Sequence, residues 1–386
     1  MILIKDGTIL TMEGRIYDKA SILIEDGRIK EIGENMVVPL DAEVIDASGK
    51  IITPGIIDAH CHLGMWEDAI GFEGADGNEA TDPVTPHLRA IDAINPMDRT
   101  FREAYEGGIT SVATGPGSAN VIGGQFVAMK TYGDRVDNMI IKDPVAMKCA
   151  FGENPKRVYN DKKQSPSTRM ATAAILRDTL FKAKEYGAKQ KASLEDPSKK
   201  PAFDMKMEAL QPVLRGEIPF KAHAHRADDI FTAIRIAKEF DVKVTLEHCT
   251  EGHLIVDHIK EEGLYAVVGP SLGDRSKYEL KNLTFETAGV LSKAGVKIAI
   301  MTDHPVVPLQ YLPMCAALAV KAGMDEEEAL KAITINAAEI LGIDNRVGSI
   351  REGKDADLVI WDGHPFALQS KVDCTVIDGK VVFRRG

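Results

Sequence analysis

Two histidines at the end of an apolar segment, His60 and His62, are the residues best suited to chemistry in this sequence. They lie in the run ITPGIIDAHCHLG, residues 52–64. Side chains in a strand alternate between faces, so both imidazoles project from one face of the predicted strand. Two neutral imidazoles converging at a strand end can bind a divalent cation such as Zn²⁺. We expect Asp58, on the same face, to orient one ring. The alternative is a pair of surface histidines near a turn, because H-x-H alone is a weak motif.

Further ligand-type residues fall at the ends of later predicted strands. They are Lys148 in PVAMKCAF, His223 and His225 in PFKAHAH, His248 in VKVTLEHC and Asp303 in VKIAIMTDHP. In a barrel of parallel strands the carboxyl ends meet at one face, and active sites lie there. Together, these residues therefore favour a metal centre over separate structural roles.

Taken singly, each of these residues has a structural explanation. Lys148 could be a buried lysine paired with an acid, since an unpaired buried ammonium is costly. His248 could be a hydrogen-bonded core histidine, and Asp303 could cap a helix. His223 and His225 share a face, so only one of the two has to be a ligand.

Strands and helices alternate through the middle of the chain, as is typical of parallel sheets. Eight apolar segments predict strands, the number that closes a (β/α)₈ TIM barrel: residues 55–62, 109–114, 125–129 (alternatively together with 139–141), 145–151, 219–225, 242–248, 264–269 and 296–302. Helices are predicted at residues 97–106, 168–186, 205–214, 229–240, 253–262, 284–294, 325–332 and 334–341. Of two long connections, we expect residues 64–97 to form a substrate lid and residues 187–204 a solvated excursion.

The two ends of the chain read as short β-strands joined by Asp-Gly hairpin signals. Each end is too small to fold well alone, so we expect them to pair. We therefore predict an α/β protein in which residues 1–54 and 344–386 form a composite β-sandwich domain and residues 55–343 form the barrel.

Composition narrows the possible classes of function. The 386 residues include 44% hydrophobic and 27% charged residues, which is ordinary for a globular protein. A net charge of −11 argues against binding to nucleic acid or to an anionic membrane, so the expected partner is a small-molecule substrate. Five widely spaced cysteines predict neither a disulfide framework nor a zinc ribbon, and a cytoplasmic location is expected.

Several of these motifs together resemble the amidohydrolase superfamily, in its imidazolonepropionase-related and metal-dependent dipeptidase-like branch. The matching segments are PGIIDAHCHLG, HAHRADDIFTAI, LEHCTEG, MTDHP and the closing segment ITINAAEILGIDNRVGSIREGKDADLVIWDGHPF. The resemblance covers nearly the whole chain. It implies a (β/α)₈ barrel flanked by a β-sandwich built from both termini, and it suggests a homo-oligomer.

The resemblance also implies a centre of two divalent cations, with zinc the expected metal. Carried over to this sequence, its ligands would be His60, His62, Lys148, His223, His248 and Asp303. Lys148 would be N-carboxylated by CO₂ and would bridge the two ions. His223 is preferred to His225 because the family's ligand corresponds to the first histidine of such a pair.

The expected reaction is hydrolysis of an amide or related C–N bond in a small substrate, such as an N-acyl amino acid, a dipeptide or a cyclic amide. Two cations would lower the pKa of a bridging water, and the resulting hydroxide would attack the carbonyl carbon. Asp303 would act as general base and then as general acid. The residues expected to contact substrate are Asn154, His225, Arg226 and His304.

Two other functions remain as alternatives. A heterocycle deaminase of the same superfamily would have one metal and an acid three positions after the fifth-strand histidine. Arg226 stands at that distance from His223, although Asp228 stands there relative to His225. A non-catalytic scaffold would lack ligands, and this sequence has a full set. Metal content separates the three possibilities.

Overall fold

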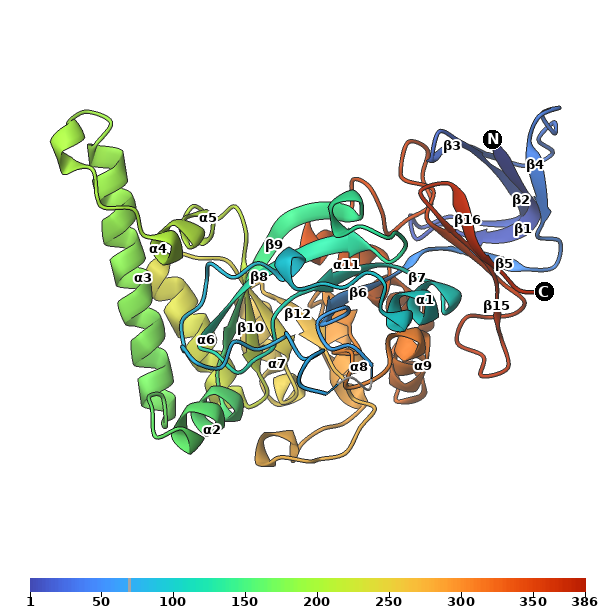
Figure 1. Cartoon of the computed structure of the whole chain (residues 1–386). Coiled ribbons are helices and arrows are strands. Elements are labelled where there is room, and N and C mark those ends of the chain that lie inside the picture. Colours follow the sequence, from blue (N-terminus) through green and yellow to red (C-terminus); the bar gives the residue numbers. More distant parts are fainter. Residues whose placement is uncertain (69–70) are drawn as a thin grey trace.

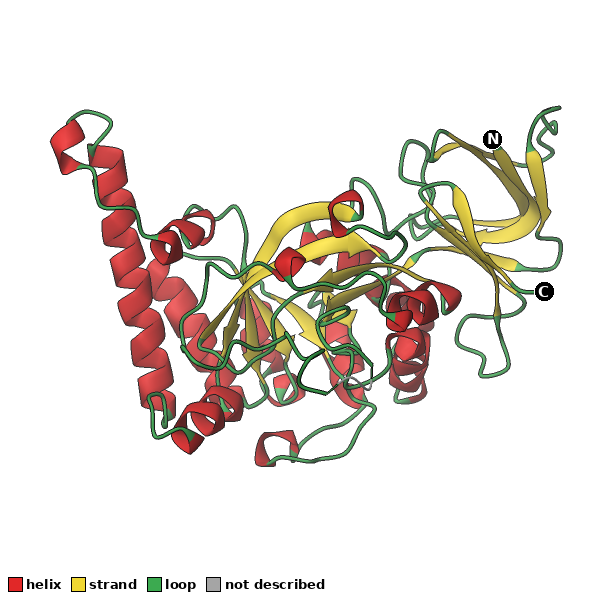
Figure 2. Cartoon of the chain, viewed as in Figure 1, coloured by secondary structure: helices red, strands yellow, loops and turns green. Residues whose placement is uncertain are grey.

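The centre of the computed structural model, which describes residues 1–68 and 71–386, is an eight-stranded sheet that curls into a nearly closed barrel (Figure 2). Its strands follow one another in chain order: β6 (Ile56–Cys61), β7 (Ile109–Thr114), β8 (Ile122–Lys130), β9 (Ile140–Ala150), β10 (Phe220–Ala224), β11 (Val244–His248), β12 (Tyr265–Val268) and β13 (Ile298–Ile300). All eight overlap the apolar runs that predicted strands, but the alternative that joined residues 139–141 to the third strand is wrong, because β9 begins at Ile140. The TIM-barrel fold class is therefore confirmed.

The third barrel strand departs from the expected parallel pattern. β8 runs antiparallel to both β7 and β9, whereas the other neighbouring pairs are parallel. The described connections at residues 115–121 and 131–139 contain no α-helix. A parallel crossover needs a dozen or more residues, so connections this short impose hairpin-like reversals instead.

The side where β6 and β13 meet is closed by hydrogen bonds from just beyond β13. The Thr302 amide and hydroxyl donate to Asp58 Oδ2 at 2.9 and 2.6 Å. The His62 amide donates to the carbonyl of His304 at 2.9 Å. Thus the two chain-distant edges of the barrel sheet are joined next to the predicted metal ligands.

Helices surround the barrel and account for most of the predicted helical segments. They are α1 (Arg99–Glu106), α2 (Glu153–Asp161), α3 (Arg169–Ala192), α4 (Met205–Ala209), α5 (Gln211–Leu214), α6 (Ala227–Phe240), α7 (Val256–Glu261), α8 (Glu286–Lys293), α9 (Leu312–Lys321), α10 (Glu326–Ala332) and α11 (Ile335–Leu341). The sequence did not predict α2 or α9.

Residues 187–204 were expected to form a solvated connection. This prediction is wrong for residues 187–192, because α3 continues to Ala192 through residues that favour helix. Among the described residues, none of these helices is long and apolar enough to cross a membrane.

Strands from both ends of the chain form a second, separate sheet at one end of the molecule, opposite α3 (Figure 1). Its strands are β1 (Ile2–Leu10), β2 (Ile16–Glu25), β3 (Arg28–Gly33), β4 (Glu43–Asp46), β5 (Ile51–Pro54), β14 (Leu358–Trp361), β15 (Val372–Ile377) and β16 (Lys380–Arg384). The order is β16-β15-β14-β5-β1-β2-β3, with β4 beside β1. The composite sheet was therefore predicted correctly, whereas the proposed domain limits stay a prediction.

A buried ion cluster joins this terminal sheet to the barrel. Lys130, at the end of β8, is 2% exposed, and its Nζ lies 2.5 Å from Asp357, 3.2 Å from Asp355 and 3.1 Å from Asp378. Burial alone would lower the pKa of Lys130, but the three carboxylates outweigh it and raise that pKa. A permanently charged lysine therefore neutralises acids that the terminal segment brings against the barrel.

We expect Lys130→Met to reduce the free energy of unfolding in urea by about 3–5 kcal/mol, because it leaves the buried carboxylate of Asp357 without its cation. The matched control is Lys182→Met, which removes an exposed i,i+4 pair with Asp178. That variant should lose less than about 1 kcal/mol. Equal urea midpoints for the two variants would contradict a stabilising role for the cluster.

Candidate metal centre

The first group of predicted ligands comes together at the ends of β6 and β13. His60 and His62 extend from β6, and Asp303 follows β13. Asp303 Oδ1 lies 3.2 Å from His62 Nε2 and 3.7 Å from His60 Nε2. One donor atom from each of the three residues lies within 4.8 Å of the other two. The predicted ligands at the ends of β6 and of the last barrel strand are therefore brought together.

Lys148 reaches this group from β9. Its side chain is completely buried, and its Nζ lies 2.8 Å from His60 Nε2. Burial, opposed mainly by the charges of Asp303 and Glu247, lowers the pKa of Lys148 to about 8. The side chain points into the barrel, beside the first group, and not outward to the helices.

The second group consists of His223 from β10, His225 directly after β10, and His248 from the end of β11. One nitrogen from each ring lies within 4.8 Å of the others. The ring centroid of His248 is 4.3 Å from that of His223 and 4.4 Å from that of His225. The predicted histidines at these two strand ends are thus brought together, and both members of the β10 pair belong to the group.

Most of the imidazoles are held by an oxygen at Nδ1, so that Nε2 is the nitrogen left for a ligand. The partner of His62 is the carbonyl of Gly115 at 2.6 Å, and that of His248 is the carbonyl of Gly269 at 2.8 Å. His225 Nδ1 lies 2.7 Å from Thr250 Oγ1. Such partners fix the tautomer and the plane of a metal-binding ring.

Asp58 was expected to orient one of the imidazole rings, and this prediction is wrong. Asp58 accepts hydrogen bonds from the His60 amide at 3.0 Å and from Thr302, so it orients backbone and not a ring. Burial raises the pKa of Asp58 to about 7 against those hydrogen bonds. The ring of His60 is held instead by Glu247, whose Oε2 lies 2.6 Å from His60 Nδ1.

Glu247 is a residue of the site that sequence reasoning missed. It is fully buried, and its carboxylate also contacts Lys221 Nζ at 3.0 Å and accepts a hydrogen bond from Thr245 Oγ1. The only signal in the sequence was a charged residue in each of two apolar strands: Glu247 directly precedes His248, and Lys221 lies two positions before His223. This spacing puts Lys221 on the same face as the histidine.

The electrostatics of the site keep the rings neutral and the acid ionised. Burial, reinforced by nearby lysines and by other imidazoles, lowers the pKa of His60, His223 and His248 well below 6.5. Burial raises the pKa of Asp303, but the neighbouring His248 and a hydrogen bond with His62 outweigh burial and lower that pKa to about 2. At neutral pH the site therefore offers imidazole lone pairs and a carboxylate.

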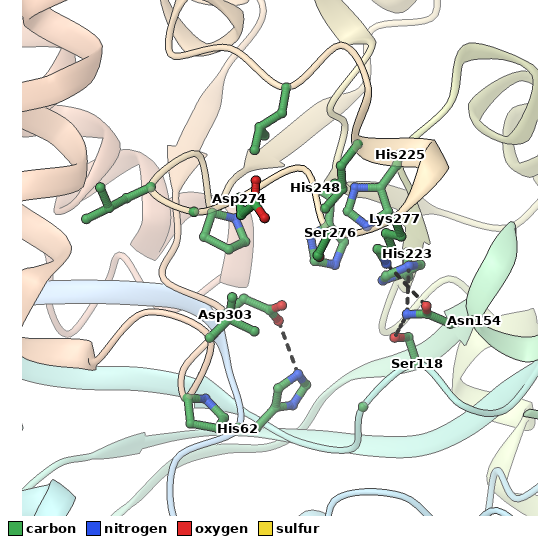
Figure 3. A pocket seen from close by; sticks show the side chains of 18 of the residues that line it. His62, Ser118, Asn154, His223, His225, His248, Asp274, Ser276, Lys277 and Asp303 are labelled. Atoms are coloured by element: carbon green, nitrogen blue, oxygen red, sulfur yellow. Dashed lines mark hydrogen bonds and ion pairs between the residues drawn. The ribbon is translucent and has the colours of Figure 1, made fainter.

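Residues of both groups line a cavity of about 670 Å³: His62 and Asp303 from the first group, and all three histidines of the second. Figure 3 shows Asp303 and His62 facing the imidazoles of the second group. Trp66 and Asn78, from the predicted lid at residues 64–97, also line this cavity. The lid prediction extends over residues 69 and 70, which lie outside the described residues. Trp66 and Asn78 thus place described parts of the connection between β6 and α1 at the cavity, whereas the role of this connection as a lid stays a prediction.

The four predicted substrate contacts divide into two pairs. Asn154 and His225 line the cavity. Arg226 instead directly precedes α6 and pairs with Asp228 at 2.8 Å. His304 accepts a hydrogen bond from the Leu309 amide at 3.2 Å. Neither of these two is among the described residues that line the cavity.

Two further polar residues, Ser118 and Lys277, line the cavity, and the sequence did not single them out. Asn154 donates to Ser118 Oγ at 2.8 Å, and Lys277 Nζ lies 2.7 Å from buried Glu279. Asn154 belongs to α2, whose start was detectable from Gly152 and from the proline in its first turn.

The residues present fit divalent cations. Buried nitrogens without a hydrogen-bond partner are rare in proteins, yet His223 Nδ1 and His225 Nε2 both lack one within the described part of the chain. Neutral imidazole and carboxylate donors suit zinc and other first-row divalent metals. Two such donor groups within one cavity provide places for two ions.

Comparisons with known proteins agree with this geometry. A family model described as "Amidohydrolase family" matches residues 51–382. The crystal structure of an amidohydrolase from Thermotoga maritima MSB8 is 48% identical, covers all of both chains and superimposes with a TM-score of 0.97.

Curated relatives include amidohydrolase tasK of Hapsidospora irregularis, 30% identical over 94% of this chain, which spans only 40% of that longer protein. An imidazolonepropionase of Geobacillus sp. (strain WCH70) is 25% identical over 97% of this chain and 92% of the relative. On this evidence the chain is an enzyme of the amidohydrolase family, whose members hydrolyse C–N bonds.

Proposed function

We propose that this enzyme uses two divalent cations to hydrolyse the C–N bond of a small amide, such as an N-acyl amino acid, a dipeptide or a cyclic amide. The observation that carries this proposal is the presence of two separate donor groups in one cavity, with Lys148 buried beside the first. A site for a single cation needs only one such group.

In this proposal His60, His62 and Asp303 hold one cation, and His223 and His248 hold the other. Lys148, carboxylated by CO₂, would add a carboxylate to the metal ligands. Supporting this modification, a pKa of about 8 leaves roughly a tenth of the amine neutral at pH 7, and the neutral amine is the form that attacks CO₂. The carbamate would turn a buried cation into a bridging carboxylate.

When bound, the cations would polarise the substrate carbonyl and lower the pKa of a water. The chain's own contribution is proton transfer at Asp303. With a pKa near 2 the carboxylate is ionised at neutral pH and can accept a proton from the attacking water. The same low pKa makes the protonated form a ready donor to the leaving nitrogen. His62, 3.2 Å away, keeps the carboxylate aimed at the cavity.

The substrate class can be tested with a panel of N-acyl amino acids, dipeptides and cyclic amides, added to metal-loaded protein while new amine and carboxylate are measured. About two ions per chain with amide hydrolysis supports the proposal, whereas one ion with ammonia release would support a deaminase instead.

A homo-oligomer and a cytoplasmic location also remain proposals. The cytoplasmic location is supported by five free, buried cysteines.

Asp303→Asn should reduce kcat by about 10²–10⁴-fold on the best substrate of that panel, because the amide cannot accept the proton. Metal content should stay close to two ions per chain. Asp178→Asn, at an exposed position on α3, is the matched control and should keep wild-type kcat. Near-normal turnover by Asp303→Asn would remove Asp303 from the role of base.

Protein prepared in ¹³C-labelled bicarbonate should show one carbamate carbon by ¹³C NMR, and Lys148→Met should lack that signal. Lys142→Met is the control for a partly buried lysine outside the cavity, and it should retain the signal. A carbamate carbon that persists in Lys148→Met would assign the modification to another residue.

A further inference from the structure

The second donor group contains one imidazole more than the proposed centre uses. His223, His225 and His248 are 2%, 4% and 3% exposed, and a nitrogen of each lies within 4.8 Å of nitrogens of the other two. His223 lies on β10 and His225 directly follows the last residue of that strand, so the two rings emerge on the same side of the extended chain. Figure 3 shows the three rings side by side at the cavity wall.

The ring of His225 is oriented by an oxygen at Nδ1, which is how metal-binding imidazoles are oriented. Its Nδ1 lies 2.7 Å from Thr250 Oγ1, and its backbone carbonyl accepts a hydrogen bond from the Glu251 amide at 2.9 Å. Nε2 is then left buried, with no hydrogen-bond partner among the residues the structure describes. A buried, unpaired nitrogen costs free energy unless something binds it.

An ion pair lies beyond the rings and supplies no hydrogen-bond partner to them. Buried Glu279 turns Oε1 toward them, 3.7 Å from His225 Nε2 and 4.0 Å from His223 Nε2, which is too far for a hydrogen bond. Lys277 pairs with the same oxygen at 2.7 Å. The carboxylate is thereby fixed behind the imidazoles and neutralised by the lysine, so His225 Nε2 gains no hydrogen-bond partner on that side among the described residues.

We propose that His225 is a ligand of the second cation, which is therefore held by three imidazoles, His223, His225 and His248. This inference rests on the two-cation function proposed above, and it replaces the substrate contact expected for His225. Three neutral nitrogen donors select zinc, cobalt or nickel over magnesium or calcium, which prefer oxygen. The three imidazoles add no negative charge of their own to that ion.

The test is a titration of metal-free full-length protein with Zn²⁺, followed by competition with a chelator. Wild type should bind two ions, and His225→Asn and His223→Asn should each weaken the second ion at least about tenfold while the first is unchanged. The matched control is His258→Asn on α7, where the side chain is 63% exposed, and it should bind both ions as wild type does.

The possible results separate this inference from the proposed function. Unchanged binding of two ions by His225→Asn overturns the third ligand and leaves the two-cation proposal intact. A wild type that binds one ion, lost in His225→Asn, supports the three-imidazole site and overturns the two-cation function. A wild type that binds no ion overturns both.

A second measurement covers the case in which His225→Asn does not fold. In crystals of zinc-loaded wild type, the anomalous signal should place an ion about 2.0–2.1 Å from a nitrogen of each of the three rings. An ion bonded to His223 and His248 but not to His225 would overturn the inference.

Discussion

The arrangement of this active site depends on holding buried imidazoles in one tautomer. Each ring must leave a lone pair free, and each buried N–H must find an acceptor. Glu247 serves His60, the carbonyls of Gly115 and Gly269 serve His62 and His248, and Thr250 serves His225. These acceptors come from different barrel elements, so the donor groups are oriented only when the barrel is closed.

The strand ends carry backbone strain where the chemistry is expected. His248 and Asp303 have φ values of 67° and 53°, in a region that costs non-glycine residues about 1–3 kcal/mol. Glu247 points into the barrel, and regular alternation would turn His248 to the opposite face. The left-handed turn brings the ring of His248 back over the cavity. Barrel packing therefore supports conformations that an isolated strand would not adopt.

The strands were predictable because their signal is local: apolar runs bounded by turn residues, with residues 109–114 matched at both ends. The donor residues were predictable because strand ends share one face of a barrel. Partners across the barrel were not, since the contact of Glu247 with His60 depends on how β11 and β6 lie relative to one another. The reversal of β8 likewise depends on connection length, which apolar patterning does not report.

The composite terminal sheet affects the order in which this protein can fold during synthesis. β5 has β1 on one side and β14 on the other, so its second edge stays open until residues 55–357 have been translated. At about 5–20 residues per second that interval is roughly 15–60 s. The ribosome thus releases the whole barrel sequence before the N-terminal strands gain their last partner, and an unpaired strand edge is exposed to aggregation throughout.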